Sequence, residues 1–511
     1  MIEQKNEVEC WGIYELQLQG PQEGNPFMDV SLSAQFIYKD KIVEPDGFYD
    51  GDGVYKIRFM PDEVGVWTFE TKSNIDILNG IKGQLTCMKA TKNNHGLVKV
   101  HNQFHFAYSD GATYFPFGTT CYAWAHQGEE LEKQTLETLK ASSFNKIRMC
   151  VFPKNYSNND NDPEYFPFAG SPPLSWDFTR FNTDFFAHLE THLLSLMEMG
   201  IESDLILFHP YDKGRWGFDR MDSATDERYL RYVIARFASF RNIWWSMANE
   251  YDYMKEKTKE DWDRYIEIVA KADPYHHLLS IHQGDVLYDH WNPHITHASV
   301  QLGTKRGTVS AGFGTLRLLR DAYHKPVIYD EVGYEGNLIQ RWGSLTAEEL
   351  VDKFWQAVTS GTYMTHGETF THPKDIIWWA KGGTLRGKSP KRIEFLKKII
   401  EESGIDGLEP LDRWWVLNGV GKNGTYYLYY FGYEKPTEWK FELPAFKTPV
   451  PMGTKFQIEI IDTWNMTITP VEALYEITDQ GRYTYTCNYN PKVELPGREF
   501  MALRIRKVFS C

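Results

Sequence analysis

The chain has 511 residues, of which 42% are hydrophobic and 24% are charged. These proportions are ordinary for globular proteins and exclude a wholly disordered, collagen-like or low-complexity chain. The formal net charge of −14 disfavours a nucleic-acid partner, because a phosphate backbone binds basic surfaces. Aromatic residues make up 15% of the chain, which suits either large cores or surfaces that stack on flat ligands such as sugar rings.

The N-terminal sequence MIEQKNEVECWGIYELQ has neither the basic start nor the apolar stretch of a signal peptide. No run of 18 apolar residues is present, so we expect no membrane partner. The six cysteines are scattered without CxxC spacing, which indicates free thiols in a reducing compartment and not a zinc site. We therefore expect a cytoplasmic protein, and the sequence leaves open whether it forms a homo-oligomer.

Residues 1–92 are expected to form a small β-sandwich. Large apolar and polar residues alternate in VYKIRFMP (54–61) and in VGVWTFET (64–71), which is the pattern of half-buried strands. The short Pro-Asp-Glu turn between these two segments predicts that they pair as a hairpin. No catalytic group of residues is confined to this part of the chain.

Residues 97–405 show eight short apolar runs that alternate with helical patterns, which predicts βα units around a parallel sheet. The runs lie at 114–124, 145–152, 202–209, 243–250, 278–283, 297–302, 326–332 and 361–368. Eight such units favour a (β/α)8 barrel. A doubly wound open sheet is disfavoured, because no GxGxxG turn follows the first run.

Residues 408–511 return to a strand pattern, with segments divided by Pro and Gly turns at 425–434, 455–464, 481–489 and 500–508. This pattern predicts a C-terminal β-sandwich. The expected fold class is therefore α/β, with a TIM barrel (97–405) flanked by sandwiches at 1–92 and 408–511.

The active site of a TIM barrel lies at the C-terminal ends of its strands. The predicted strands end in an unusual number of polar or titratable residues: Tyr122, Trp124, Arg148, His209, Asn249, Glu250, His282, Gln301, Glu331, His366 and Glu368. Glu250 and Glu331 stand out because each closes a run that is otherwise apolar enough for a buried strand. A single glutamate of this kind could be a salt-bridged residue at the barrel rim, but a pair is harder to explain in that way.

Two carboxyl groups are what hydrolysis of a glycosidic bond requires, one protonated and one ionised. The fourth and seventh strands face each other across a closed barrel, so Glu250 and Glu331 are expected to converge on one sugar. Glu250 follows Trp244 and Trp245, where partial desolvation would raise its pKa and suit an acid. Arg148 would favour an ionised carboxylate nearby, which suits Glu331.

The segments SMANE (246–250) and IYDEVGYE (328–335) resemble the clan A retaining glycoside hydrolases. The resemblance covers about 300 central residues. It implies that Glu250 is the acid/base, that Glu331 is the nucleophile and that Asn249 binds the sugar 2-hydroxyl. The substrate implied is an oligosaccharide of plant or microbial origin, and no cofactor is expected.

Other strand-end residues would support substrate binding. Arg148 and His209 match positions where the clan often carries Arg and His, while His282 and His366 are further candidates. The clan usually offers a Tyr near the nucleophile, where this sequence has Gln301, so Tyr288 or Tyr334 from a loop could substitute. Aromatic residues that could each stack on a sugar face are Tyr122, Trp124, Trp216, Trp378 and Trp379, and Trp124 and Trp378 are preferred because their loops open on the catalytic face. The long aromatic loop 153–182 is expected to form a wall of the site.

The domain order is similar to a bacterial group with an N-terminal Ig-like domain, an apiosidase-like or cellulase-like barrel and a C-terminal sandwich. The segments GFYDGDG (47–53), YKIRFMP (55–61) and FPFGTTCYAWAH (115–126) carry this likeness.

Three alternatives remain open. A metal-dependent barrel hydrolase could use His209, His282 and His366 with a carboxylate. A carbohydrate-binding or scaffold protein could use the same fold without catalysis. The same two glutamates could also serve transglycosylation.

Overall fold

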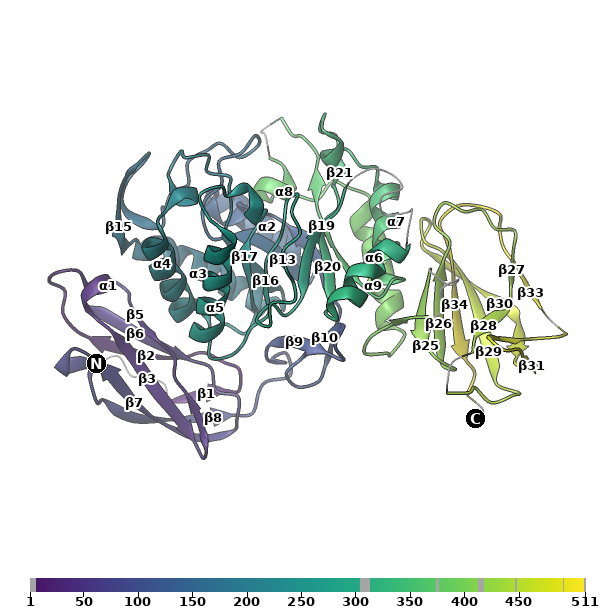
Figure 1. The fold of residues 1–511 in the computed structure, drawn as a ribbon, viewed down its shortest axis with the longest axis horizontal. Coiled ribbons are helices and arrows are strands. Elements are labelled where there is room, and N and C mark those ends of the chain that lie inside the picture. The colour runs from purple at the N-terminus through teal and green to yellow at the C-terminus, as the bar shows by residue number, and fades with distance from the viewer. Residues whose placement is uncertain are drawn as a thin grey trace.

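The computed structural model describes six stretches of the chain, without the side chains of residues 313–315: 6–303, 313–373, 376–411, 418–445, 448–489 and 491–509. A central (β/α)8 barrel lies between an N-terminal and a C-terminal β-domain (Figure 1). This arrangement confirms the predicted fold class. No helix in these stretches is long and apolar enough to cross a membrane.

The N-terminal domain is a sandwich of two sheets. The five-stranded sheet has the order β1-β8-β7-β3-β4, with strands Glu7–Glu9 (β1), Leu32–Tyr38 (β3), Lys41–Val43 (β4), Gly65–Ser73 (β7) and Lys82–Met88 (β8). The three-stranded sheet has the order β2-β6-β5, with strands Tyr14–Gln19 (β2), Gly47–Tyr49 (β5) and Val54–Phe59 (β6). The connections include the short helices α1 (Pro26–Asp29) and η1 (Asp76–Leu78).

The predicted hairpin between β6 and β7 is wrong. β6 pairs with β2 and β5, whereas β7 pairs with β3 and β8 in the other sheet. The Pro-Asp-Glu turn therefore crosses from one sheet to the other. Alternation of apolar residues identifies half-buried strands, but in a sandwich both sheets bury the same pattern, so it does not reveal which strands pair.

The barrel is an eight-stranded parallel sheet whose spatial order β18-β17-β16-β13-β12-β22-β20-β19 follows the chain around the ring. A parallel bridge between His282 and Ser299 joins its two ends. The strands are Phe117–Thr120 (β12), Lys146–Cys150 (β13), Glu202–Phe208 (β16), Ile243–Ala248 (β17), Leu279–Ser280 (β18), Ala298–Gln301 (β19), Val327–Glu331 (β20) and Tyr363–His366 (β22).

Helices cover the outside of the barrel (Figure 1). They are Glu129–Lys140 (α2), Thr183–Glu198 (α3), Ser223–Phe237 (α4), Lys259–Ala272 (α5), Phe313–Tyr323 (α6), Ala347–Val358 (α7) and Ser389–Glu401 (α9). The short helix Trp378–Lys381 (α8) lies instead in the loop after the eighth strand. Capping boxes begin α5, between Thr258 and Asp261, and α7, between Thr346 and Glu349.

Short elements lie in the loops at the C-terminal ends of the strands. They are η2 (Trp124–His126), β14 (Phe168–Ser171), β15 (Ser175–Phe181), η3 (Phe218–Arg220), η4 (Tyr251–Tyr253), β21 (Glu335–Gly336), η5 (Arg341–Gly343) and β23 (Glu368–Thr369). β14 and β15 form a hairpin within the long loop 153–182.

Four charged side chains fill part of the barrel interior. Lys146 Nζ lies 2.8 Å from Asp204 and 3.0 Å from Asp330. Arg148 lies 3.6 Å and 3.5 Å from the same two carboxylates. The two positive and two negative charges balance, and all four side chains are buried, so each depends on the others for compensation.

The N-terminal end of the barrel is closed by a small antiparallel sheet of β9 (Val98–His101), β10 (His105–Tyr108) and β11 (Thr113–Tyr114). Phe106 of β10 is fully buried there. Its ring packs against Trp244, His297 and Tyr363, with ring centroids 5.3 to 5.8 Å apart. In Figure 1 β9 and β10 lie at the lower end of the barrel, opposite β21.

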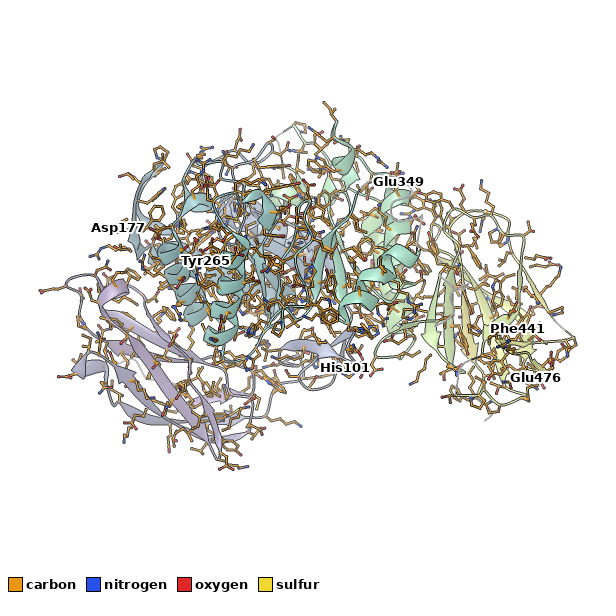
Figure 2. All side chains as sticks on the ribbon, in the orientation of Figure 1. His101, Asp177, Tyr265, Glu349, Phe441 and Glu476 are labelled. Atoms are coloured by element: carbon orange, nitrogen blue, oxygen red, sulfur yellow. The ribbon has the colours of Figure 1, made fainter. Side chains whose placement is uncertain are left out.

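The C-terminal domain is a second sandwich. Its main sheet has the order β24-β25-β26-β34-β29-β30, with strands Glu409–Pro410 (β24), Gly419–Lys422 (β25), Tyr426–Tyr430 (β26), Lys455–Asp462 (β29), Thr467–Glu476 (β30) and Met501–Lys507 (β34). The smaller sheets contain Glu438–Lys440 (β27), Glu442–Pro444 (β28), Asp479–Gln480 (β31), Thr484–Thr486 (β32) and Lys492–Glu494 (β33). Phe441 is buried in this core, while Glu476 lies on the edge strand β30 (Figure 2).

Both flanking domains pack against the outside of the barrel. Arg58 of the N-terminal sandwich pairs with Glu190 of α3 at 2.6 Å and donates to the backbone carbonyl of Arg236. On the other side, the Tyr430 hydroxyl donates to Asp352 of α7 at 3.0 Å. One apolar core continues from the barrel into the C-terminal sandwich, so this domain supports the barrel wall.

Candidate active site

A cavity of about 150 Å³ lies at the C-terminal ends of the barrel strands. Its lining residues come from the barrel strands and the loops that follow them: Tyr122, Lys154, Tyr156, Tyr211, Asn249, Glu250, Gln301, Leu302, Glu331, Gly333, Tyr334, Trp342 and Trp379. The predicted catalytic pair Glu250 and Glu331 and the predicted binding residues Tyr122 and Asn249 are therefore brought together, with Gln301 and Tyr334 beside them. The flanking domains contribute nothing to this set.

Glu250 follows β17 in a left-handed backbone conformation, with φ of +50°. This conformation is costly for a residue with a side chain, by about 1–3 kcal/mol, and persists where the surrounding structure imposes it. Glu250 also begins η4, and only 6% of its surface is exposed. Such strain is concentrated at functional sites, so the backbone itself marks this glutamate.

The pKa of Glu250 is raised to about 8. Burial is the largest cause, and the negative charge of Glu331 adds to it. The positive charge of Lys154 and a hydrogen bond from Gln301 oppose the rise. The Glu250 carboxyl is therefore protonated at neutral pH, as a proton donor must be.

Glu331 ends β20 and is less buried than Glu250. Its Oε1 accepts a short hydrogen bond from the Tyr122 hydroxyl. The Tyr334 side chain lines the same cavity, and burial together with the Glu331 charge raises the pKa of Tyr334 well above its usual value. Two neutral tyrosines thus face this carboxylate.

Asn249 lies between the two glutamates and the barrel interior. Its Oδ1 accepts hydrogen bonds from the Tyr122 hydroxyl at 3.3 Å and from Arg148 Nη2 at 3.2 Å. With Oδ1 engaged in this way, the amide NH2 group remains as the donor for a ligand. Arg148 itself is fully buried and does not line the cavity, so it contacts Asn249 and not a substrate in this cavity.

Lys154 was not predicted from the sequence. Its Nζ lies 3.8 Å from the centroid of the Tyr122 ring, 4.2 Å from that of Tyr211 and 4.9 Å from that of Trp379. Burial lowers the pKa of Lys154, while the negative charge of Glu331 opposes the change. The available signal was its position at the start of the long loop after the second strand, which was expected to form a wall of the site.

The three predicted histidines lie outside the cavity lining. His209 Nε2 donates to the Phe152 carbonyl at 3.2 Å, and its Nδ1 accepts from the Tyr211 backbone. His366 is buried beside Thr119, and His282 is buried in the barrel wall. Burial is the first cause that lowers the pKa of all three, so they are neutral. Among the residues that the structure describes, these histidines do not converge as metal ligands.

The expected stacking of Trp124 and Trp378 on sugar is wrong. Both side chains are fully buried in the core, and the Trp378 indole donates to Thr119 at 2.9 Å. The neighbouring Trp379 lines the cavity instead. Likewise, Tyr334 lies in the cavity, whereas the Tyr288 hydroxyl donates to Asp263 at 2.5 Å away from it.

We expect Tyr122→Phe to lower kcat/KM by about 10- to 100-fold, the worth of a hydrogen bond to a charged group. The substitution removes the hydroxyl that donates to Glu331 and to Asn249 but keeps the ring. Steady-state kinetics on an active glycoside would measure the loss. Tyr323→Phe, on α6, is the matched control; equal kinetics for Tyr122→Phe and the control would remove Tyr122 from the site.

Comparison with known proteins places the chain in a family. Residues 100–406 match the apiosidase-like catalytic domain. A crystal structure of a proposed glycoside hydrolase from Bacteroides vulgatus ATCC 8482 is 42% identical, with a TM-score of 0.94, and the alignment covers 98% of this chain and 100% of that one. The chain belongs to the apiosidase-like family. This apiosidase-like protein is a glycosidase with a glycoside hydrolase barrel.

The parts of the enzyme outside the barrel also match known families. Residues 7–74 match the domain of unknown function DUF5060, and residues 414–506 match DUF5605. A glycoside hydrolase family 5 structure from Bacteroides vulgatus ATCC 8482 is 13% identical with a TM-score of 0.57, covering 81% of this chain and 94% of that one, and shares the fold. A search of curated proteins gave no match.

Proposed function

We propose that the enzyme hydrolyses a glycosidic bond in an oligosaccharide by double displacement, with Glu250 as acid/base and Glu331 as nucleophile. One observation carries the proposal: two glutamates from strands on opposite sides of the barrel line a single cavity in different environments. Glu250 is buried with a raised pKa, while Glu331 accepts a hydrogen bond from Tyr122. Glycosidases need this division of roles between two carboxyl groups.

In the first step the Glu250 carboxyl gives its proton to the glycosidic oxygen while Glu331 attacks the anomeric carbon. The bond to the leaving group breaks and a glycosyl-enzyme ester forms. In the second step Glu250, now ionised, takes a proton from water, and the water oxygen displaces Glu331. The Asn249 amide donates to the sugar 2-hydroxyl, and Tyr156, Tyr211 and Trp379 offer rings to a sugar face.

The test is a panel of aryl α- and β-glycosides, with the anomer of the first-formed product followed by NMR. We expect release of the aryl group from one sugar type and a product of the same anomeric configuration as the substrate. An inverted product would overturn double displacement. Binding of glycans without release of reducing sugar, under conditions in which the protein is folded, would instead favour a carbohydrate-binding protein.

The activity should depend on the proton of Glu250. Because its pKa is raised to about 8, the acid form persists through neutral pH and is lost as pH rises through that value. We expect kcat/KM to be level near pH 7 and to fall by about tenfold per pH unit above the pKa. A pH–rate profile on a glycoside with a poor leaving group would measure this, and a profile flat to pH 10 would contradict it.

Lys154 should set the position of that alkaline limb. Its positive charge lowers the pKa of Glu250, so Lys154→Met is expected to move the limb to higher pH. Lys140→Met, an exposed substitution at the end of α2, is the matched control and should leave the limb in place. Equal profiles for the two variants would show that Lys154 does not influence the acid.

A further inference from the structure

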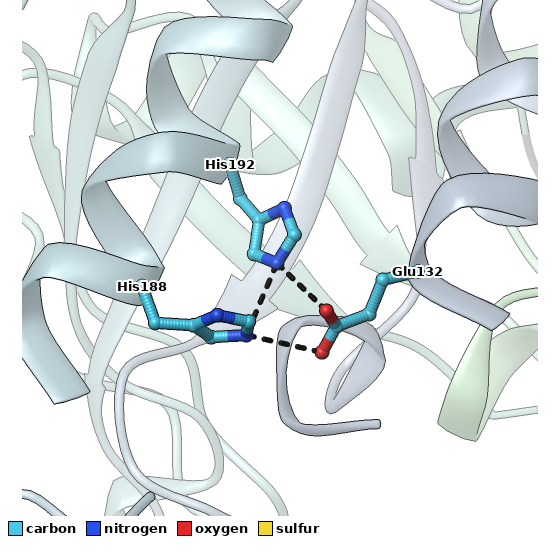
Figure 3. Close-up of side chains that lie close together, drawn as sticks. All are labelled: Glu132, His188 and His192. Atoms are coloured by element: carbon cyan, nitrogen blue, oxygen red, sulfur yellow. Dashed lines mark hydrogen bonds and ion pairs between the residues drawn. The ribbon is translucent and has the colours of Figure 1, made fainter. Parts of the chain in front are cut away.

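Three metal-ligating side chains converge on the outside of the barrel, away from the catalytic cavity. His188 and His192 lie four residues apart on α3 and therefore on the same face of that helix. Glu132 comes from the first turn of α2. Figure 3 shows both imidazole rings and the carboxylate pointing toward one another.

One ligand atom from each of the three residues lies within 4.8 Å of the other two, and each histidine contacts a different oxygen of the Glu132 carboxylate. The Nε2 atoms of His188 and His192 lie 3.2 Å apart. The first is 3.2 Å from Glu132 Oε1 and the second 3.1 Å from Glu132 Oε2. Four ligands placed tetrahedrally around zinc at about 2.0–2.1 Å lie about 3.3 Å from one another.

If Glu132 is ionised, hydrogen bonds among these three side chains cannot pair every donor with an acceptor. If both histidines carry a proton on Nε2, two N–H groups face each other at 3.2 Å. If one of them lacks that proton, its lone pair faces a carboxylate oxygen. A cation between the three groups would accept a lone pair from each and remove the conflict.

We propose that Glu132, His188 and His192 bind a divalent transition-metal ion, with zinc as the ion that this donor set and spacing fit. Imidazole and carboxylate are common zinc ligands, and water would complete the fourth position. The side chain of His188 is 29% exposed, which leaves a route for the ion, while Glu132 and His192 are largely enclosed.

The surroundings give this site a structural role. The Trp124 ring packs against His192, with ring centroids 4.6 Å apart. Trp124 and Ala125 lie in η2, which begins two residues after Tyr122. The ion would thus join α2 and α3 at the segment that follows this catalytic-site tyrosine.

The test begins with the untagged full-length protein, stripped with a chelator and titrated with zinc by calorimetry. We expect one zinc ion to bind per chain and to raise the melting temperature. His188→Gln should weaken zinc binding by at least about 100-fold, since loss of even an outer-sphere partner costs 10- to 100-fold. His294→Gln, at an exposed histidine outside the site, should bind zinc as the wild type does.

Equal zinc binding by His188→Gln and the wild type would overturn the proposal, as would no saturable binding by the wild type. Cobalt substitution gives a measurement that does not depend on any variant folding. The stripped wild-type protein should develop the strong visible absorption of a four-coordinate cobalt ion, and its absence would also count against the site. A stripped enzyme that stays folded should keep its kcat, because none of the three ligands lines the catalytic cavity; loss of kcat would overturn the structural role.

Discussion

Replacing Glu331 with alanine is expected to lower kcat/KM by at least about 10⁴-fold on every substrate, because it removes the proposed nucleophile. Glu250→Ala should depend on the leaving group. On a poor leaving group the loss is expected to be about 10²–10⁴-fold, the usual worth of a general acid. On a dinitrophenyl glycoside, which leaves without protonation, the first step should survive and a burst of dinitrophenol should precede slow turnover.

Azide distinguishes the two roles more sharply. In Glu250→Ala, azide attacks the ester formed at Glu331 without needing a general base, so the glycosyl azide keeps the configuration of the substrate. In Glu331→Ala, azide occupies the space of the missing carboxylate and attacks the substrate directly, so the configuration inverts. NMR of the two products measures both results.

Glu394→Ala, at an exposed position on α9, is the matched control for both substitutions and should keep wild-type kinetics. If Glu250→Ala gave the inverted azide product and Glu331→Ala the retained one, the assignments of Glu250 and Glu331 would be exchanged. If both variants kept near-normal turnover while folded, neither glutamate would be catalytic.

Asp330→Asn is expected to give the largest loss of stability, about 3–5 kcal/mol in the free energy of unfolding, the usual effect of breaking a buried ion pair. Asp330 accepts hydrogen bonds at 2.6 Å from Ser299 and Thr365, in addition to its ion pair with Lys146. The substitution leaves Lys146 and Arg148 with one carboxylate between them, Asp204, in the interior of the barrel. Urea unfolding, followed through the transition that includes the barrel, would measure the loss.

Asp321→Asn is the matched control, because Asp321 forms an ion pair with Arg317 at 2.9 Å on the surface, where its side chain is 47% exposed. Exposed pairs contribute about 0–1 kcal/mol, so this variant should resemble the wild type. Similar losses for Asp330→Asn and Asp321→Asn would mean that the buried network adds no special stability.

The acid dependence of the Asp330 contribution follows from its pKa. Burial opposes ionisation of Asp330, but Lys146 and Arg148 lower its pKa well below the ordinary value of 3.8. A folded-state pKa below that of the unfolded chain gives stability that is fully present above the unfolded value and is lost as pH falls toward the folded one. The difference between wild type and Asp330→Asn should therefore be constant at neutral pH and shrink in acid.

The barrel was predictable from the sequence because parallel strands buried on both faces leave continuous apolar runs. Glu250 and Glu331 were predictable for the same reason, since a charge at the end of such a run is conspicuous. Strand pairing in the N-terminal sandwich was not, because β6 and β7 carry the same alternating pattern in different sheets.

The other residues of the site could not be predicted from the sequence, because their place in it depends on how side chains in the loops are oriented. Trp378 and Trp379 are adjacent, yet one is buried against Thr119 and the other lines the cavity. Lys154 belongs to the site only because the loop folds its ammonium group onto aromatic rings from other segments. No periodic pattern in the sequence marks either Trp379 or Lys154 as a site residue. His188 and His192 do show a pattern, a spacing of four on a predicted helix, but their partner Glu132 lies 56 residues from His188.

The packing of Phe106 against Trp244 and Tyr363 closes the barrel at the end opposite the cavity. In the part of the chain that the structure describes, the C-terminal end of the barrel, where the cavity lies, is therefore the route for substrate, leaving group and water. In the proposed double displacement, water reaches the glycosyl-enzyme after the leaving group has moved away from Glu250. A leaving group that departs slowly, or any alcohol present at high concentration, would accept the sugar in place of water. Under the proposed mechanism, the balance between hydrolysis and sugar transfer would therefore be set by the order in which molecules exchange at this end of the barrel.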